Sequence, residues 1–272
     1  MPSYLCDAAV RAVSAAGSNV EFYGLDSDLQ PLLDPRDVDQ DSMVLMVTYF
    51  GLSQTLPLSL IRSFRRPIVD NACAFYRSMP GDFWSFNSAR KFVGVADGAY
   101  LTGPNSAEID ASSNVFGSEE HLRARQLGEP DAHQLYRRAE RSFDNSVSAM
   151  SDRSRRRMSR ADHVKICNRR RRNYESLQEM LGMANRLQIG LDADDVPHYY
   201  PFLSSIPIHQ RLIQEGILVP SLWSEVITRS PRSPSWEQDL ATRLLPLPID
   251  QRYGHVHMER VAAVVREVLD DI

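Results

Sequence analysis

The chain has 272 residues, of which 43% are hydrophobic and 24% charged, with a net charge of −4 and a pI of about 6.0. These values are typical of a soluble globular protein with one large domain, or one large and one small. They give no indication of binding to nucleic acid or to an anionic membrane. The three cysteines have no metal-ligand spacing, and their odd number fits a reducing compartment.

The N-terminus, "MPSYLCDAAVRAV", lacks the basic start and apolar stretch of a signal peptide. The most apolar segment, "MVLMVTYFGL" from Met43, is far shorter than a bilayer-spanning helix and reads as a buried strand. We therefore expect a cytoplasmic protein with no membrane partner.

Helices and strands alternate along the first hundred residues. The patterns predict helices over 6–17 and 57–66 and strands over 19–26, 43–50, 67–72 and 82–86, with Gly17 ending the first helix. In the first helix an apolar stripe is expected from Ala8, Val10, Val13 and Ala15. Such alternation predicts an α/β fold with a mostly parallel sheet covered by helices.

The rest of the chain differs in composition and in predicted secondary structure. Residues 118–185 are polar and helical, with ten basic residues and one acid between Arg153 and Arg172. One stripe there repeats at helical spacing: Ile166, Arg170, Tyr174, Leu177 and Leu181. Strands are expected at 198–203, 216–220 and 244–249, before a final helix from about His257. We divide the chain into a large α/β region (1–150), a helical connection (151–190) and a smaller α+β C-terminal domain (191–272).

Two residues of the first region carry candidate chemistry. Asp70 closes an apolar strand, and Lys91 follows the next strand-like segment, "DFWSF". Ligands of open α/β sheets gather beyond the carboxyl ends of the strands, so both side chains could face one crevice. This pairing suits pyridoxal phosphate, in which a lysine forms a Schiff base and an acid keeps the pyridine nitrogen protonated.

The pattern also has an ordinary explanation. A lysine beside an arginine is usually a solvated surface charge, and an aspartate ending a strand usually caps the next turn. Spacing alone favours that explanation.

Several motifs, in this order along the chain, favour the functional interpretation of Asp70 and Lys91: "VLMVTYFG", "PIVDNACAF", "SFNSARKFVGVADGAYL", "NRRRRNYESL", "DVPHYYPFL", "LIQEGILVPSLW" and "LLPLPIDQRYG". Together they resemble the DegT-type sugar aminotransferases, which are fold-type I pyridoxal-phosphate-dependent enzymes. The resemblance covers nearly all of the chain.

The resemblance implies pyridoxal 5'-phosphate as cofactor, Lys91 as its Schiff-base lysine and Asp70 as the partner of its pyridine nitrogen. Ser85 or Ser88 stands near the serine that contacts the cofactor phosphate in the family; the spacing to the lysine fits neither well. A homodimer with sites at the subunit interface is also implied.

The sequence departs from the family pattern at two cofactor-contacting positions. Cys73 occupies the position of the usual glutamine, three residues after the aspartate. Cys6 occupies the position of the aromatic residue that stacks on the ring, although Tyr4 is close enough to take that part. A thiol can pack against a ring but lacks the flat contact of an aromatic side chain.

The first residues resemble a point well inside the family's large domain, so the N-terminal portion of the fold is expected to be incomplete. In the family that portion includes backbone amides that hold the phosphate. A shortened sequence, a mis-assigned start and a naturally degenerate relative all remain open.

Other candidate sites have weaker support. The arginine-rich stretch fits no nucleic-acid-binding motif and reads as a solvated face or a subunit interface, although Arg169 to Arg172 could hold a sugar-nucleotide diphosphate. His255 and His257 complete no metal site, and no serine-hydrolase elbow occurs.

The resemblance therefore implies a cytoplasmic aminotransferase that acts on a keto-sugar, nucleotide-linked, with glutamate or a similar amino donor. The alternative is a degenerate, non-catalytic relative that serves as a binding or partner module. Lys91 and Asp70 favour the enzyme, whereas Cys6, Cys73 and the missing start favour the alternative.

Overall fold

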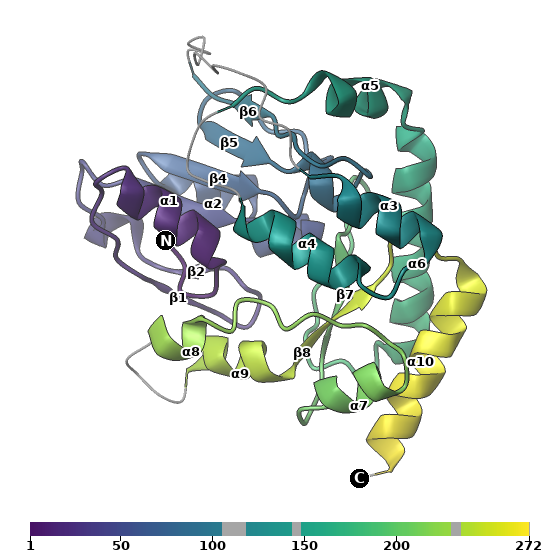
Figure 1. Ribbon diagram of the computed structural model, residues 1–272. Helices are drawn as coiled ribbons and strands as arrows, with labels where there is room; N and C mark the ends of the chain where they lie inside the picture. Colours follow the sequence, from purple (N-terminus) through teal and green to yellow (C-terminus); the bar gives the residue numbers. More distant parts are fainter. Residues whose placement is uncertain (105–117, 143–147, 230–234, 272) are drawn as a thin grey trace.

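A four-stranded sheet forms the centre of the N-terminal half of the computed structural model, which describes residues 1–104, 118–142, 148–229 and 235–271 (Figure 1). Its strands lie in the order β3 (Val44–Val47), β4 (Pro67–Asn71), β5 (Trp84–Asn87) and β6 (Leu101–Thr102). The first three are parallel, and β6 is antiparallel to β5. The predicted α/β architecture with a mostly parallel sheet is confirmed.

The N-terminal helix differs in its packing from the prediction. Helix α1 (Asp7–Ala15) ends just before Gly17, whose φ of 78° stops it as expected. None of its residues is buried, so the expected apolar stripe is not part of the core. Of the predicted strand over 19–26, only β1 (Gly24–Leu25) forms, paired with β2 (Pro31–Leu32). Helix α2 (Leu58–Ser63) connects β3 to β4.

The middle of the chain is helical, as its composition predicts. It contains α3 (Glu120–Leu127), α4 (Ala132–Arg141), α5 (Asp152–Arg160) and the long α6 (His163–Leu181). The stripe predicted on α6 is confirmed, because all five of its residues are buried. Helix α6 packs against α10 (His255–Asp270), and the two run along one side of the molecule (Figure 1).

Between α6 and α10 the chain forms an antiparallel pair, β7 (Tyr199–Leu203) with β8 (Leu244–Pro248), and the helices α7 (His209–Gln214), α8 (Val226–Arg229) and α9 (Trp236–Arg243). The strand predicted over 216–220 is wrong. Its alternation reflects burial without a partner strand: Ile217 and Val219 are buried and Leu218 is exposed. The amide of Ile217 instead donates a hydrogen bond to the carbonyl oxygen of Leu212 in the last turn of α7.

One hydrophobic core contains all of β3 together with buried residues of β7, β8 and α10. A second, smaller cluster contains Ala89, Phe92, Val93 and Val95 of the turn around Lys91, with Met158 of α5 and Ile166 of α6. The turn that carries the lysine is therefore anchored by helices from the middle of the chain. None of the helices in the described ranges is long and apolar enough to cross a bilayer.

Candidate active site

Two neighbouring parallel strands deliver Asp70 and Lys91 to the same edge of the sheet. Asp70 is the fourth of the five residues of β4. After β5 the chain turns in a single 3-10 helix, Ala89–Lys91, which places Lys91 just beyond the carboxyl end of that strand. Because β4 and β5 run in the same direction, their carboxyl ends meet at one edge, where α/β sheets bind ligands.

The amine of Lys91 lies among acidic groups while the residue remains exposed to solvent. Its Nζ donates a hydrogen bond to Sγ of Cys73 at 3.2 Å. Burial of the ammonium lowers the pKa of Lys91, but the thiol of Cys73, the carboxylate of Asp70 and the thiol of Cys6 outweigh it and raise the pKa above its usual value. The side chains of Cys73, Asp70 and Cys6 are therefore all close enough to Lys91 to affect its pKa.

Asp70 is only 6% exposed, and its Oδ1 accepts a hydrogen bond of 2.7 Å from the amide of Ala72. Its other oxygen, Oδ2, accepts none from any residue that the structure describes. Burial raises the pKa of Asp70, and the opposing effects of Lys91 and the Ala72 amide are smaller. No ion pair within 4.0 Å joins Asp70 to Lys91 in the described chain, so the two groups are coupled across a gap rather than in contact.

The turn that carries Lys91 is held from behind by Arg170 of α6. Its guanidinium donates to the carbonyl oxygens of Lys91 (3.2 Å) and His198 (3.0 Å) and lies 4.6 Å from the centre of the Phe92 ring. Gln251 completes this support, because it accepts from Arg170 and donates to the carbonyl of Phe92 at 2.7 Å. Burial lowers the pKa of Arg170 to about 10, which still leaves it charged at neutral pH.

Two further residues of the site come from the start of β7 and were not singled out from the sequence. The ring of His198 lies 5.3 Å from that of Phe92 and 4.1 Å from that of Tyr199, centre to centre. Burial, followed by the charges of Lys91 and Arg170, lowers the pKa of His198 well below its usual value. Burial raises the pKa of Tyr199, against a smaller lowering by Lys91. The motif "DVPHYYPFL" contained both residues, but without the fold nothing connected them to Lys91.

The register of the sheet distinguishes the two candidate serines. Ser85 is opposite Val69 and Phe86 is opposite Asp70, so Ser85 points to the face away from Asp70. Ser88 has extended backbone angles (φ −140°, ψ 113°), which continue the alternation and place it on the Asp70 face. It is half-buried, and its hydroxyl bonds to no residue in the described ranges.

The geometry also distinguishes Cys6 from Tyr4. Tyr4 is fully buried in the main core, where its ring centre lies 4.6 Å from that of Trp223 and 5.9 Å from that of Tyr49. Cys6 remains partly exposed and influences the pKa of both Lys91 and Cys73. Tyr4 therefore packs the core, and Cys6 faces the candidate site.

These residues fit pyridoxal phosphate. The amine of Lys91 can react with an aldehyde, and the open Oδ2 of buried Asp70 can accept a hydrogen bond from a protonated ring nitrogen. Ser88 offers a free hydroxyl on the same face. Burial also raises the pKa of the Cys73 thiol, and the nearby charge of Lys91 opposes that rise.

Two of the arginines that could hold a diphosphate, Arg170 and Arg171, make hydrogen bonds to main-chain carbonyls. Arg170 is 2% exposed and fully engaged, and Arg171 donates to the carbonyls of Asp192 and Asp195. His255 and His257 both lie on α10, and no cluster able to hold a metal ion occurs in the described parts of the chain.

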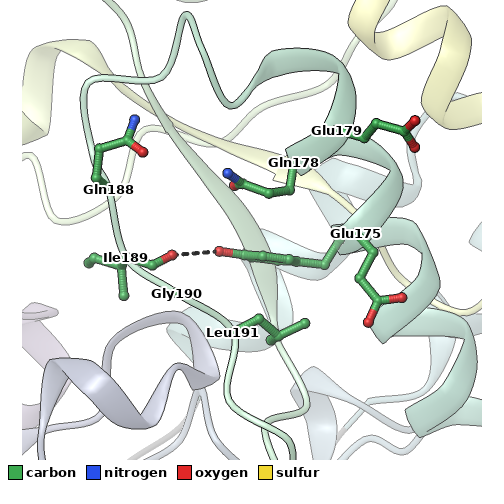
Figure 2. A pocket seen from close by; sticks show the side chains of 8 residues that line it. Glu175, Gln178, Glu179, Gln188, Ile189, Gly190 and Leu191 are labelled. Carbon is green, nitrogen blue, oxygen red and sulfur yellow. Dashed lines mark hydrogen bonds between the residues drawn. The ribbon is translucent and has the colours of Figure 1, made fainter.

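A separate hollow of about 460 Å³ lies between α6 and the segment Gln188–Leu191 (Figure 2). Figure 2 shows Glu175, Gln178 and Glu179 of α6 on one side of it, and the hydroxyl of Tyr174 donates to Ile189 across it at 3.2 Å. It shares no residue with the group around Lys91, so it is distinct from the candidate active site.

Comparison with solved structures gives the same fold over almost the whole chain. The aminotransferase TlmJ from Streptoalloteichus hindustanus superposes with a TM-score of 0.65 at 19% identity, covering 99% of this chain and 78% of that one. The sugar aminotransferase CalS13 from Micromonospora echinospora gives 0.65 at 14% identity, covering 98% and 79%. A DegT DnrJ EryC1 StrS aminotransferase from Brucella abortus gives 0.61 at 15% identity, covering 98% and 78%.

The chain has the fold of these aminotransferases. No family model matches the sequence, and no curated protein matches it either. The likeness at 14–19% identity therefore establishes the fold, while activity, cofactor and substrate depend on the site itself.

Proposed function

We propose that the protein is a pyridoxal-phosphate-dependent aminotransferase that transfers an amino group to a nucleotide-linked keto-sugar. One observation carries this proposal: the amine of Lys91 and a buried aspartate with one open oxygen lie at the carboxyl edge of two parallel strands and share one electrostatic environment. The solved structures of the same fold include sugar aminotransferases and a DesI structure described as containing its TDP-sugar product.

Pyridoxal phosphate, when bound, supplies an aldehyde that amines can attack and a ring that accepts electron density from the substrate carbon. Asp70 would hold the proton on the ring nitrogen, because its Oδ2 accepts no other hydrogen bond from the described chain. Ser88 would contact the phosphate, and Cys6 would pack against the ring where family members have an aromatic residue.

Lys91 would hold the cofactor covalently and, once displaced by the amino donor, carry a proton on Nζ to and from the substrate carbon. The chain has only two lysines, Lys91 and Lys165, and Lys165 is exposed on α6. The Nζ of Lys91 is consequently the one lysine nitrogen at the sheet edge. Arg170 and Gln251 would keep that nitrogen in place, because both bond to the main chain of the turn that carries it.

Further parts of the proposal rest on the resemblance rather than on the site. We propose a homodimer in the cytoplasm and glutamate or a similar amine as donor. We also propose a large α/β region over 1–150, a helical connection over 151–190 and a smaller C-terminal domain over 191–272.

A second function has its own supporting observation. Lys91 makes its hydrogen bond to Cys73, where the family usually has glutamine, and Cys6 replaces the broad contact of an aromatic ring. Weaker cofactor binding would leave a non-catalytic relative that binds a partner or a sugar ligand.

Titration with pyridoxal phosphate separates the two functions. We expect a visible absorbance band that is lost in Lys91→Ala and kept in Lys165→Ala, the matched control. Borohydride treatment should fix the cofactor to the peptide that contains Lys91, and glutamate should convert the band in the untreated protein. Absence of a band at saturating cofactor, with normal folding by circular dichroism, would leave the binding module as the better account.

A further inference from the structure

The Lys91 amine donates its hydrogen bond to sulfur rather than to oxygen. Its Nζ lies 3.2 Å from Sγ of Cys73, within hydrogen-bonding distance for a sulfur acceptor. A second thiol, that of Cys6, is near enough to affect the pKa of both partners. The site thus contains a nitrogen and a sulfur in contact, with a second sulfur beside them.

The pair lies beside solvent-exposed residues. Cys73 itself is 6% exposed, while the residue Lys91 is exposed and Cys6 is partly exposed. The third cysteine, Cys167, lies on α6 beside the second core cluster. It is partly exposed, and its thiol makes no hydrogen bond to a lysine in the described chain, so it serves as an internal control.

We propose that Cys73 and Lys91 form a reversible covalent cross-link under oxidising conditions, with peroxide as the oxidant. Peroxide first oxidises the thiol, RSH + H₂O₂ → RSOH + H₂O, which reduces the peroxide to water. The deprotonated amine of Lys91 then attacks the sulfenic sulfur, RSOH + R'NH₂ → RS–NHR' + H₂O, so that an S–N bond forms and the S–O bond breaks. Sulfenic acids are known to condense with nitrogen in this way.

The contact distance decides which partner the sulfenic acid meets first. The nitrogen of Lys91 is already at 3.2 Å from Sγ, whereas Cys6 makes no hydrogen bond to Cys73 in the described chain. A small thiol reverses the reaction in two exchanges, first releasing the amine as a mixed disulfide forms on Cys73, then reducing that disulfide. The cross-link would remove the one nucleophilic amine of the site until the protein is reduced.

This cross-link does not depend on the proposed aminotransferase activity, because it needs no cofactor and is measured by mass. Full-length protein without added pyridoxal phosphate is treated with hydrogen peroxide at strongly alkaline pH, because the raised pKa of Lys91 keeps its amine protonated at lower pH. It is then capped with iodoacetamide, digested and analysed by mass spectrometry. We expect the peptides containing Cys73 and Lys91 to be joined, with a mass two hydrogen atoms below their sum. Dithiothreitol added before digestion should separate them.

Single-residue variants identify which two side chains form the cross-link. Cys6→Ser and Cys167→Ser should keep the cross-link, and Lys91→Arg should lose it while Cys73 proceeds to sulfinic acid. A peptide pair joined through Cys6 and Cys73 in the wild-type protein would replace the proposal with a disulfide. Oxidation of Cys73 to sulfinic acid with Lys91 still free to react with acetic anhydride would overturn it outright.

A functional measurement follows from the same samples. Peroxide-treated protein should lose the capacity of Lys91 to react with acetic anhydride, and dithiothreitol should restore it. Lys165 reports on the general condition of the sample, because it lies outside the site and should react equally throughout.

Discussion

The guanidinium of Arg170, in the middle of α6, donates a hydrogen bond to the main-chain carbonyl of Lys91 at 3.2 Å. The helix of the central segment thereby fixes the turn at the end of β5 that presents the candidate catalytic amine. The same guanidinium binds the carbonyls of Pro197 and His198 at the entry to β7. One buried cation thus joins three segments that surround the site.

Arg170→Met is expected to lower the free energy of unfolding by roughly 3 kcal/mol, because four buried or partly buried acceptors lose their donor at once. Urea denaturation followed by circular dichroism measures the change. The turn should also loosen, so acetic anhydride labelling of Lys91 should change as well.

Arg172→Met on the same helix is the control, since Arg172 is exposed and the change should stay within about 0.5 kcal/mol. Equal stabilities of the two variants would show that Arg170 does not hold the turn.

Local patterns were sufficient to predict much of the fold. Branched residues in 43–50 and 67–72 and the stripe on α6 indicated the parallel sheet and the buried helix face. The stripe even contained Arg170, and an arginine on an otherwise apolar face signals a buried cation with partners in the fold. What it binds could not be predicted, because its partners lie 27 to 81 residues away.

The site was predictable only where its residues follow the ends of adjacent strands. Asp70 and Lys91 met that condition. His198 and Tyr199 did not, because their place beside Lys91 depends on how β7 packs against the sheet, which no local pattern encodes. The strand expected over 216–220 failed for a related reason: burial alternates there without a pairing partner.

Gly51→Ala should destabilise the protein by more than a left-handed backbone alone explains. Gly51 has a φ of 79°, and an added Cβ would lie 2.6 Å from the carbonyl oxygen of Val196 and 2.7 Å from that of Cys73. Both are main-chain atoms that cannot move freely, so we expect a loss of roughly 3 kcal/mol and a displaced Cys73. Thermal unfolding measures the loss.

Gly216→Ala is the matched control for that variant. Gly216 has a φ of 81°, but nothing lies within 4 Å of an added Cβ. Its cost should be about 1 kcal/mol, from backbone strain alone. If both alanine variants unfold at the same temperature, the crowding at Gly51 is not what restricts it.

Asp70→Asn should make the protein without cofactor more stable at neutral pH relative to wild type. Because burial raises the pKa of Asp70, the native state binds a proton more tightly than the unfolded chain. The stability from this group is fully present below the ordinary pKa of about 3.9 and is lost as pH rises through the higher folded pKa. Asparagine has no such titration.

Urea denaturation of both proteins between about pH 4 and pH 7 tests this sign. The advantage of Asp70→Asn over wild type should grow with pH, while Asp194→Asn at an exposed position should track wild type. The same Asp70 variant should bind pyridoxal phosphate more weakly, since the ring nitrogen loses its acidic partner. An advantage that shrinks with rising pH would mean that Asp70 is stabilised as the carboxylate.

Cys73→Ala should lower the pH at which the Lys91 amine becomes reactive. Cys73 is the largest of the influences that raise the pKa of Lys91, and it also accepts the amine's hydrogen bond, so its removal leaves burial, which lowers the pKa, less opposed. Acetic anhydride labelling as a function of pH, quantified for each peptide, measures the pH midpoint of the Lys91 reaction.

Lys165 reacts in the same sample and serves as the reference, because it is exposed in both proteins. Cys167→Ala should leave the Lys91 midpoint unchanged, and a midpoint that rises in Cys73→Ala would show that the thiol does not stabilise the ammonium.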